Sequence, residues 1–170
     1  ATKNSDIDIM VVIDGLNVTD LKTYRSIIES LENYDKSCGF ICSKSDLANW
    51  NPLEICHLTN STKDYVGVLR DLVPQYSDLD IRNFIKLSIN NTYHVICHSY
   101  IHADTKQNVE NLPQIYKGVF FILQNIYYLN HGIFINNKSE LLHLLNNIDH
   151  DILEMSIQIN KGLPYNFEKC

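Results

Sequence analysis

Positive charge and long apolar runs are both scarce in this sequence. Its 170 residues include 14 Lys and Arg against 20 Asp and Glu, which gives a formal net charge of −6. A chain this acidic has no bulk electrostatic attraction to nucleic acid. The longest apolar stretches, such as residues 119–123, are too short to cross a bilayer, so we expect no membrane span.

A disulfide framework is missing as well. The chain has 5 Cys, an odd number, at positions without the regular spacing of a disulfide-rich domain. This usage is typical of reduced thiols in a cytosolic protein. We therefore expect a cytoplasmic location.

The first part of the chain has the pattern of a small α/β unit. Residues 6–13 are predicted to form a strand that ends at the turn signal Asp14-Gly15. The apolar run at residues 38–43 is predicted to pair beside this strand, and a helix is expected between the two. Further predicted pieces are short helices at 45–50 and 52–58 and an edge strand at 62–66.

The rest of the chain, after Pro74, has a helical pattern. The first predicted helix begins at Asp78 or Asp80 and runs through Tyr100. The second follows Pro113, from Gln114 to about Asn130, and Gly132 ends it. Two shorter helices are predicted over residues 138–147 and 150–159. No internal repeat is present, and 45% hydrophobic residues suffice for one compact domain or two small ones. The pattern predicts an α+β protein with a C-terminal helical bundle.

The candidate site begins with two aspartates at the start of the first strand. Asp6 and Asp8 are two residues apart, and side chains alternate between the faces of a strand, so both carboxylates are expected on one face. Two like charges this close are unfavourable unless a cation neutralises them. Carboxylate oxygens in this arrangement suit Mg²⁺, which binds one or two carboxylates together with substrate phosphates.

The segment Ser5-Asp6-Ile7-Asp8, followed by an apolar strand, resembles the metal-binding strand of the nucleotidyltransferase superfamily, which has the DNA-polymerase-β-like fold. The resemblance implies a small mixed β-sheet core over residues 1–70 and a helical bundle over residues 71–170. In that family a Gly-Ser pair, which holds the nucleotide's phosphates, precedes the motif. This pair is not in the sequence, so the core is expected to be N-terminally incomplete.

The resemblance also implies an activity. It is the Mg²⁺-dependent transfer of a nucleoside monophosphate from a nucleoside triphosphate to an acceptor whose identity stays open. Asp6 and Asp8 would be the catalytic metal ligands, and Ser5 would support the substrate-binding loop.

A second interpretation stays open beside this one. The family usually supplies a third carboxylate from a neighbouring strand, but residues 38–43 contain none, and Asp35 and Asp46 only flank that run. The alternative is a catalytically degenerate nucleotide-binding or antitoxin-like module, either monomeric or a homodimer.

Three histidines form a second constellation on the long predicted helix. His94, His98 and His102 are spaced by four residues, so they lie near one stripe of the helix. A step of four residues drifts by roughly 40° around the helix axis, which keeps all three from one ion. We expect a hydrogen-bonded polar seam that faces the bundle, with a substrate-binding or proton-transfer role for His94 and His98 as the alternative.

Lys117 lies early in the next predicted helix. Its ammonium group is suited to bind a triphosphate as a point charge, and a solvated surface lysine is an equally good interpretation.

Overall fold

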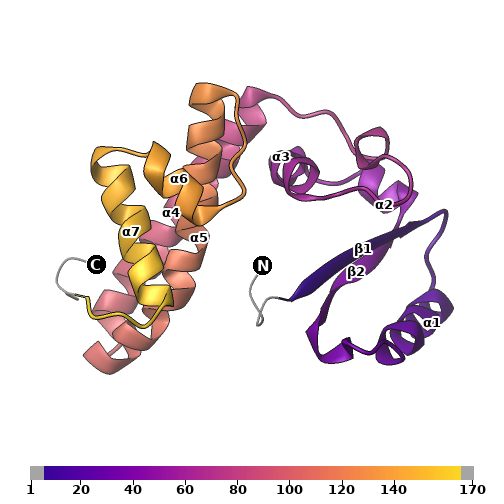
Figure 1. Cartoon of the computed structure of the whole chain (residues 1–170), viewed down its shortest axis with the longest axis horizontal. Coiled ribbons are helices and arrows are strands. Elements are labelled where there is room, and N and C mark those ends of the chain that lie inside the picture. Colours follow the sequence, from indigo (N-terminus) through magenta and orange to yellow (C-terminus); the bar gives the residue numbers. More distant parts are fainter. Residues whose placement is uncertain (1–5, 166–170) are drawn as a thin grey trace. The chain divides into compact units, whose positions relative to one another are not determined.

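The computed structural model describes residues 6–165 of the chain. These residues divide into two compact units. Unit 1 contains residues 6–55 and 63–75, and unit 2 contains residues 56–62 and 76–165. Each unit is described by itself, and Figure 1 labels its elements.

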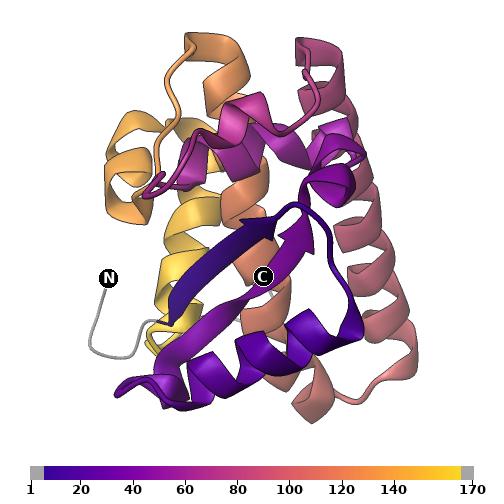
Figure 2. The ribbon, with the colours of Figure 1, turned by 90° about the vertical axis from the view of Figure 1, so that its right-hand side faces the viewer.

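Unit 1 holds the two strands. Its elements are β1 (Ile7–Ile13), α1 (Val18–Glu29), the 3₁₀ turn η1 (Tyr34–Lys36), β2 (Ser37–Ser43), α2 (Lys44–Ala48), the start of α3 (Pro52–Ser61) and the 3₁₀ turn η2 (Leu69–Asp71). The strands β1 and β2 run side by side in the same direction, as Figure 2 shows, and α1 connects them. The register pairs Ile7 with Ser37 and Ile13 with Ser43.

Local sequence signals explain where the helices of unit 1 begin. Asn17 is the N-cap of α1, because its side chain accepts hydrogen bonds from the backbone of Thr19 and Asp20. Ser43 caps α2 in the same way and forms a capping box with Asp46. The predicted strand at residues 6–13 and its pairing with residues 38–43 are confirmed.

The predicted edge strand at residues 62–66 is wrong. This segment is irregular, and Tyr65 and Val66 are 86% and 98% exposed. A β-branched or aromatic residue favours a strand only where a neighbouring surface covers it. No such surface covers these two side chains, so the local propensity is not expressed.

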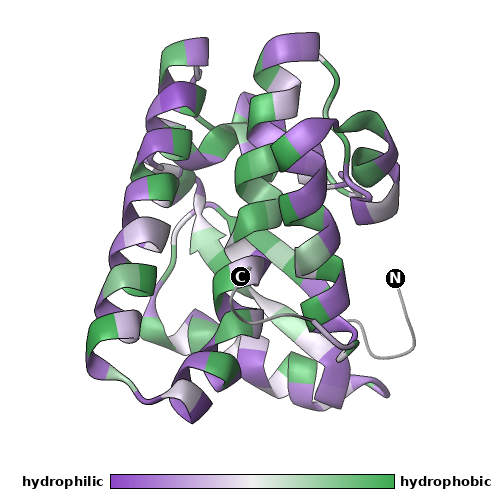
Figure 3. Ribbon diagram, turned by 90° about the vertical axis from the view of Figure 1, so that its left-hand side faces the viewer, coloured by the Kyte–Doolittle hydropathy of each residue, from purple (hydrophilic) through white to green (hydrophobic). Residues whose placement is uncertain are grey.

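Unit 2 contains the long helices. They are α4 (Asp78–His102), α5 (Thr105–His131), α6 (Lys138–Leu144) and α7 (Asn147–Asn160). The helix α5 packs against α4 and α7, and α6 packs against α7. Hydrophobic and hydrophilic residues alternate along these helices in Figure 3, as expected of helices that bury one side.

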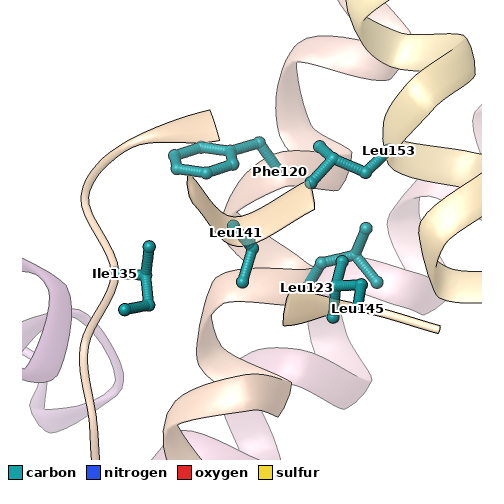
Figure 4. Packing of buried hydrophobic residues seen from close by; sticks show 6 residues of the cluster. All are labelled: Phe120, Leu123, Ile135, Leu141, Leu145 and Leu153. Atoms are coloured by element: carbon teal, nitrogen blue, oxygen red, sulfur yellow. The ribbon is translucent and has the colours of Figure 1, made fainter. Parts of the chain in front are cut away.

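A compact apolar core holds α5, α6 and α7 together. Figure 4 shows its buried members, which are Phe120, Leu123, Ile135, Leu141, Leu145 and Leu153. Leu141 and Leu153 are fully buried. Residues from three helices and from the segment before α6 therefore share one interior.

The predicted start of α5 after Pro113 is wrong, because the helix begins at Thr105 and contains this proline. Asp104 caps the helix and forms a capping box with Gln107, which fixes the earlier start. Proline has no N–H, so it removes one hydrogen bond from the helix. Packing of the neighbouring Leu112 and Tyr116, both buried, offsets that cost. The predicted end at Gly132 is confirmed, because this residue is the left-handed C-cap of α5.

The expected α+β class is confirmed at a coarse level. Within residues 6–165, the chain has one small sheet of two parallel strands, and most of the remaining elements are helical. No helix in this part of the chain has the length and apolar character needed to span a membrane.

Candidate functional site

The aspartate pair lies at the N-terminal end of β1. Asp8 is the second residue of the strand and Asp6 directly precedes it, and both residues are exposed. Their positions, two apart on an extended backbone, aim both side chains to the same face. Among residues 6–165, neither carboxylate has an ion-pair partner. The pair is therefore accessible and its charge is not neutralised by a described basic side chain.

The neighbouring strand gives this face its other side chains. Asp8 is in register with Cys38, and Met10 is in register with Phe40. Register partners in a parallel sheet point to the same face, so the carboxylates adjoin a thiol and an apolar surface. Trp50 stacks on Phe40 with a ring-centroid distance of 5.8 Å. On this face of the sheet, the aspartate pair is therefore followed by an aromatic patch formed by Phe40 and Trp50.

A third carboxylate is not supplied by the strand β2. Asp35 lies in η1, before β2 begins. Asp46 accepts hydrogen bonds from the backbone N–H of Ser43 at 2.9 Å and from its hydroxyl at 2.6 Å. These bonds lower the pKa of Asp46. Its carboxylate therefore completes the capping box of α2 with Ser43. In the described part of the chain, no three His, Cys, Asp or Glu side chains form a metal-binding group.

One predicted site residue, Ser5, lies outside the described residues. Besides Asp6 and Asp8 of unit 1, the remaining candidates belong to unit 2. His94 and His98 are on α4, and Lys117 is on α5.

The histidines do not form the expected seam inside the bundle. His94, His98 and His102 are all exposed, and none of their rings has a hydrogen bond within residues 6–165. Their ring centroids are 5.9 Å apart for His94 and His98, and 4.6 Å apart for His98 and His102. The three imidazoles form a row along the solvent-facing side of α4. A substrate-binding role for His94 and His98 stays a prediction.

Lys117 has a charged neighbour, Lys138, that the sequence did not indicate. Lys138 is half-buried, its Nζ lies 5.3 Å from the ring centroid of Phe120, and Lys117 is exposed. Burial lowers the pKa of Lys138, and the positive charge of Lys117 lowers it further. An anion bound beside the two ammonium groups would relieve their mutual repulsion. Because 21 residues separate them, only the packing of Lys138, at the start of α6, over Phe120 of α5 reveals the pair.

Unit 2 also contains a groove between α4, α5 and α7. Its volume is about 620 Å³, and most lining side chains are apolar, including Ile96, Leu112 and Val119. Asp149 is the charged residue of the lining. A mainly apolar groove with a negative charge is unsuited to a triphosphate.

Comparisons of the chain with protein-family models, with curated proteins and with solved structures each found no match. The resemblance to nucleotidyltransferases therefore depends on the Ser-Asp-Ile-Asp motif and the strand that follows it.

Proposed function

We propose that the chain is a Mg²⁺-dependent nucleotidyltransferase that moves a nucleoside monophosphate from a nucleoside triphosphate to an acceptor. One observation carries the proposal. Asp6 and Asp8 are exposed at the start of a parallel strand, point to one face and have no ion-pair partner within residues 6–165. Two accessible carboxylates that no described basic side chain neutralises leave their oxygens available to a divalent cation.

The donor set of this pair fits Mg²⁺. Both ligands are hard oxygens, and Mg²⁺ is commonly bound by one or two carboxylates, with water and substrate phosphates completing its six positions. Two protein ligands therefore suffice for a site that is completed by the triphosphate. A bound Mg²⁺ would neutralise the charge that develops on the transferred phosphate and on the leaving pyrophosphate.

Each unit contributes side chains with separate tasks in this proposal. Asp6 and Asp8 hold the metal, and the pairing of Asp8 with Cys38 in the sheet holds the backbone of this ligand in place. The stacked Phe40 and Trp50 give an aromatic surface on the same face, which suits the flat base of a nucleotide. Lys117 and Lys138 form a further anion-binding pair on unit 2.

A second candidate is a nucleotide-binding or antitoxin-like module without turnover. The observation that favours it is the missing third carboxylate, since β2 contains none and Asp46 is engaged as a helix cap. Such a module would keep Mg²⁺-dependent binding and lose the transfer step.

Pyrophosphate release separates the two candidates. The full chain is incubated with Mg²⁺ and each of ATP, GTP, CTP and UTP, together with a panel of hydroxyl-bearing and phosphate-bearing acceptors. The transferase proposal predicts release that is lost in Asp8→Asn and kept in Asp64→Asn, an exposed aspartate of the same unit. Binding of a nucleotide without any release supports the second candidate, and absence of both binding and release contradicts both.

A further inference from the structure

The exposed histidines of α4 include a pair, His98 and His102, whose rings lie close enough to bind one ion. His98 and His102 are four residues apart on a regular helix, so their side chains leave the same side of α4 one turn apart. Their ring centroids are 4.6 Å apart, closer than the 5.9 Å between His94 and His98. Two imidazoles at this spacing can turn one nitrogen each toward a common ion.

Accessibility favours a ligand there. Both rings are exposed and make no hydrogen bond within residues 6–165, so binding an ion would break no described interaction. Histidine pairs with this four-residue spacing on a helix are the protein's part of many zinc sites. Imidazole nitrogen is a ligand for Zn²⁺, Ni²⁺ and Cu²⁺, whereas Mg²⁺ prefers oxygen.

The geometry limits the site to two protein ligands. Each step of four residues turns the side chain by roughly 40° around the helix, so His94 and His102 diverge from each other. This agrees with the absence of a three-ligand group in the described part of the chain. The nearby Cys97 is half-buried, and it directly precedes His98, so its side chain leaves α4 about 100° around the helix axis from that histidine. The site therefore consists of His98, His102 and water.

We propose that His98 and His102 chelate one divalent transition-metal ion of the Ni²⁺, Cu²⁺ and Zn²⁺ group on the exposed face of α4. The site is distinct from the oxygen site at Asp6 and Asp8 in its ligands and in the metals that it selects. It shares no metal ligand with the proposed nucleotide site, so loss of Ni²⁺ binding and loss of the transfer reaction can be told apart.

Calorimetric titration of the full chain with NiCl₂ at pH 7.5 tests this proposal, since Ni²⁺ does not oxidise the free thiols as Cu²⁺ can. We expect one Ni²⁺ per chain. Loss of a residue that only supports a metal ligand costs about 10–100-fold in affinity. Loss of a ligand itself should cost at least as much, so His98→Asn and His102→Asn should each weaken Ni²⁺ binding by at least about tenfold. The helix content of each variant is checked by circular dichroism, because α4 must remain folded for the comparison.

Four controls define the outcome. His94→Asn should change the affinity by less than about threefold, because it removes no direct ligand. His143→Asn, an exposed histidine on α6, Cys97→Ser and Asp8→Asn should bind Ni²⁺ as the wild type does. Equal affinity of the wild type, His98→Asn and His102→Asn would overturn the proposal. So would an equal loss in His143→Asn or Asp8→Asn.

Discussion

Gly39, at the residue scale, is a position in β2 where a side chain cannot be accommodated. Its φ of +141° is one that residues with a Cβ rarely adopt. A Cβ at this residue would overlap the backbone carbonyl of Ile9, its register partner in β1. The close approach of the two strands at this point therefore requires glycine.

Replacing this glycine should disrupt the sheet that carries the aspartate pair. We expect Gly39→Ala to destabilise unit 1 by about 3 kcal/mol or more, because backbone strain alone costs about 1–3 kcal/mol and the overlap with Ile9 adds to it. Trp50, the single tryptophan of the chain, stacks on Phe40 and reports unfolding of this unit by its fluorescence in urea.

Gly15→Ala is the matched control. A Cβ at Gly15 meets no atom within 4 Å, and its φ is not in the left-handed region. Its free energy of unfolding should differ from that of the wild type by no more than an ordinary surface substitution causes, about 0.5 kcal/mol. Equal urea midpoints for Gly39→Ala and Gly15→Ala would show that the backbone at Gly39 does not exclude a side chain.

At the residue scale, the sequence predicts features that depend on neighbouring residues and misses those that depend on distant ones. Asp6 and Asp8 stand out because their spacing and the apolar run after them are local. The constraint on Gly39 arises from Ile9, 30 residues earlier, and the pairing of Lys117 with Lys138 crosses a helix end. These depend on tertiary structure, so the sequence alone could not reveal them.

Among the elements, α6 is the shortest of the helices in unit 2, yet it supplies part of the core. Leu141 is fully buried in the cluster with Phe120 and Leu153, while Leu144, three residues later, is 42% exposed. The helix is too short to be stable by itself. Its fold therefore depends on the contacts that Leu141 makes.

Truncating these two leucines should have unequal effects. Leu141→Ala should lower the free energy of unfolding by about 2–5 kcal/mol, the range for a buried leucine that leaves a cavity. Leu144→Ala should lower it by about 1 kcal/mol, because its side chain is 42% exposed and its loss leaves no cavity in the core. Urea denaturation followed by circular dichroism measures both, and a loss for Leu144→Ala as large as that for Leu141→Ala would contradict this core.

Element boundaries were predictable where a capping signal was local. Helical periodicity and an acidic first turn marked α4, and Gly132 marked the end of α5. The start of α5 was missed because Pro113 is a strong breaker by itself, whereas the capping box at Asp104 and packing of the helix outweigh it. The false strand at residues 62–66 has the reverse cause, a local propensity without a surface to cover it.

At the scale of the whole molecule, stability should depend on pH through His57. This half-buried ring lies edge-on against Phe121 at 4.9 Å, and its Nδ1 is 3.4 Å from the hydroxyl of Ser61. Burial lowers the pKa of His57 below 6.5, and the nearby side-chain amide of Gln124 partly opposes this shift. The folded chain therefore holds His57 neutral at pH values where the unfolded chain is protonated.

The sign of the pH effect follows from this difference. Above pH 6.5 both states are neutral and the full stability is present, and as the pH falls through 6.5 the unfolded state takes up the proton first, so stability declines. We expect His57→Gln to lose less stability than the wild type between pH 7.5 and pH 5.5. His143→Gln, which removes an exposed histidine, should keep the wild-type dependence. The same pH dependence in all three chains, measured by urea denaturation, would show that His57 does not contribute.

The central claim is that Asp6 and Asp8 hold Mg²⁺ together with a nucleoside triphosphate. Its most direct measurement is isothermal titration calorimetry of the full chain with ATP and with GTP, with and without Mg²⁺. We predict binding of at least one nucleotide that requires Mg²⁺, that is lost in Asp6→Asn and Asp8→Asn, and that is kept in Asp64→Asn. Nucleotide binding that is unchanged by Asp6→Asn and Asp8→Asn, or no binding with Mg²⁺ present, would contradict the account.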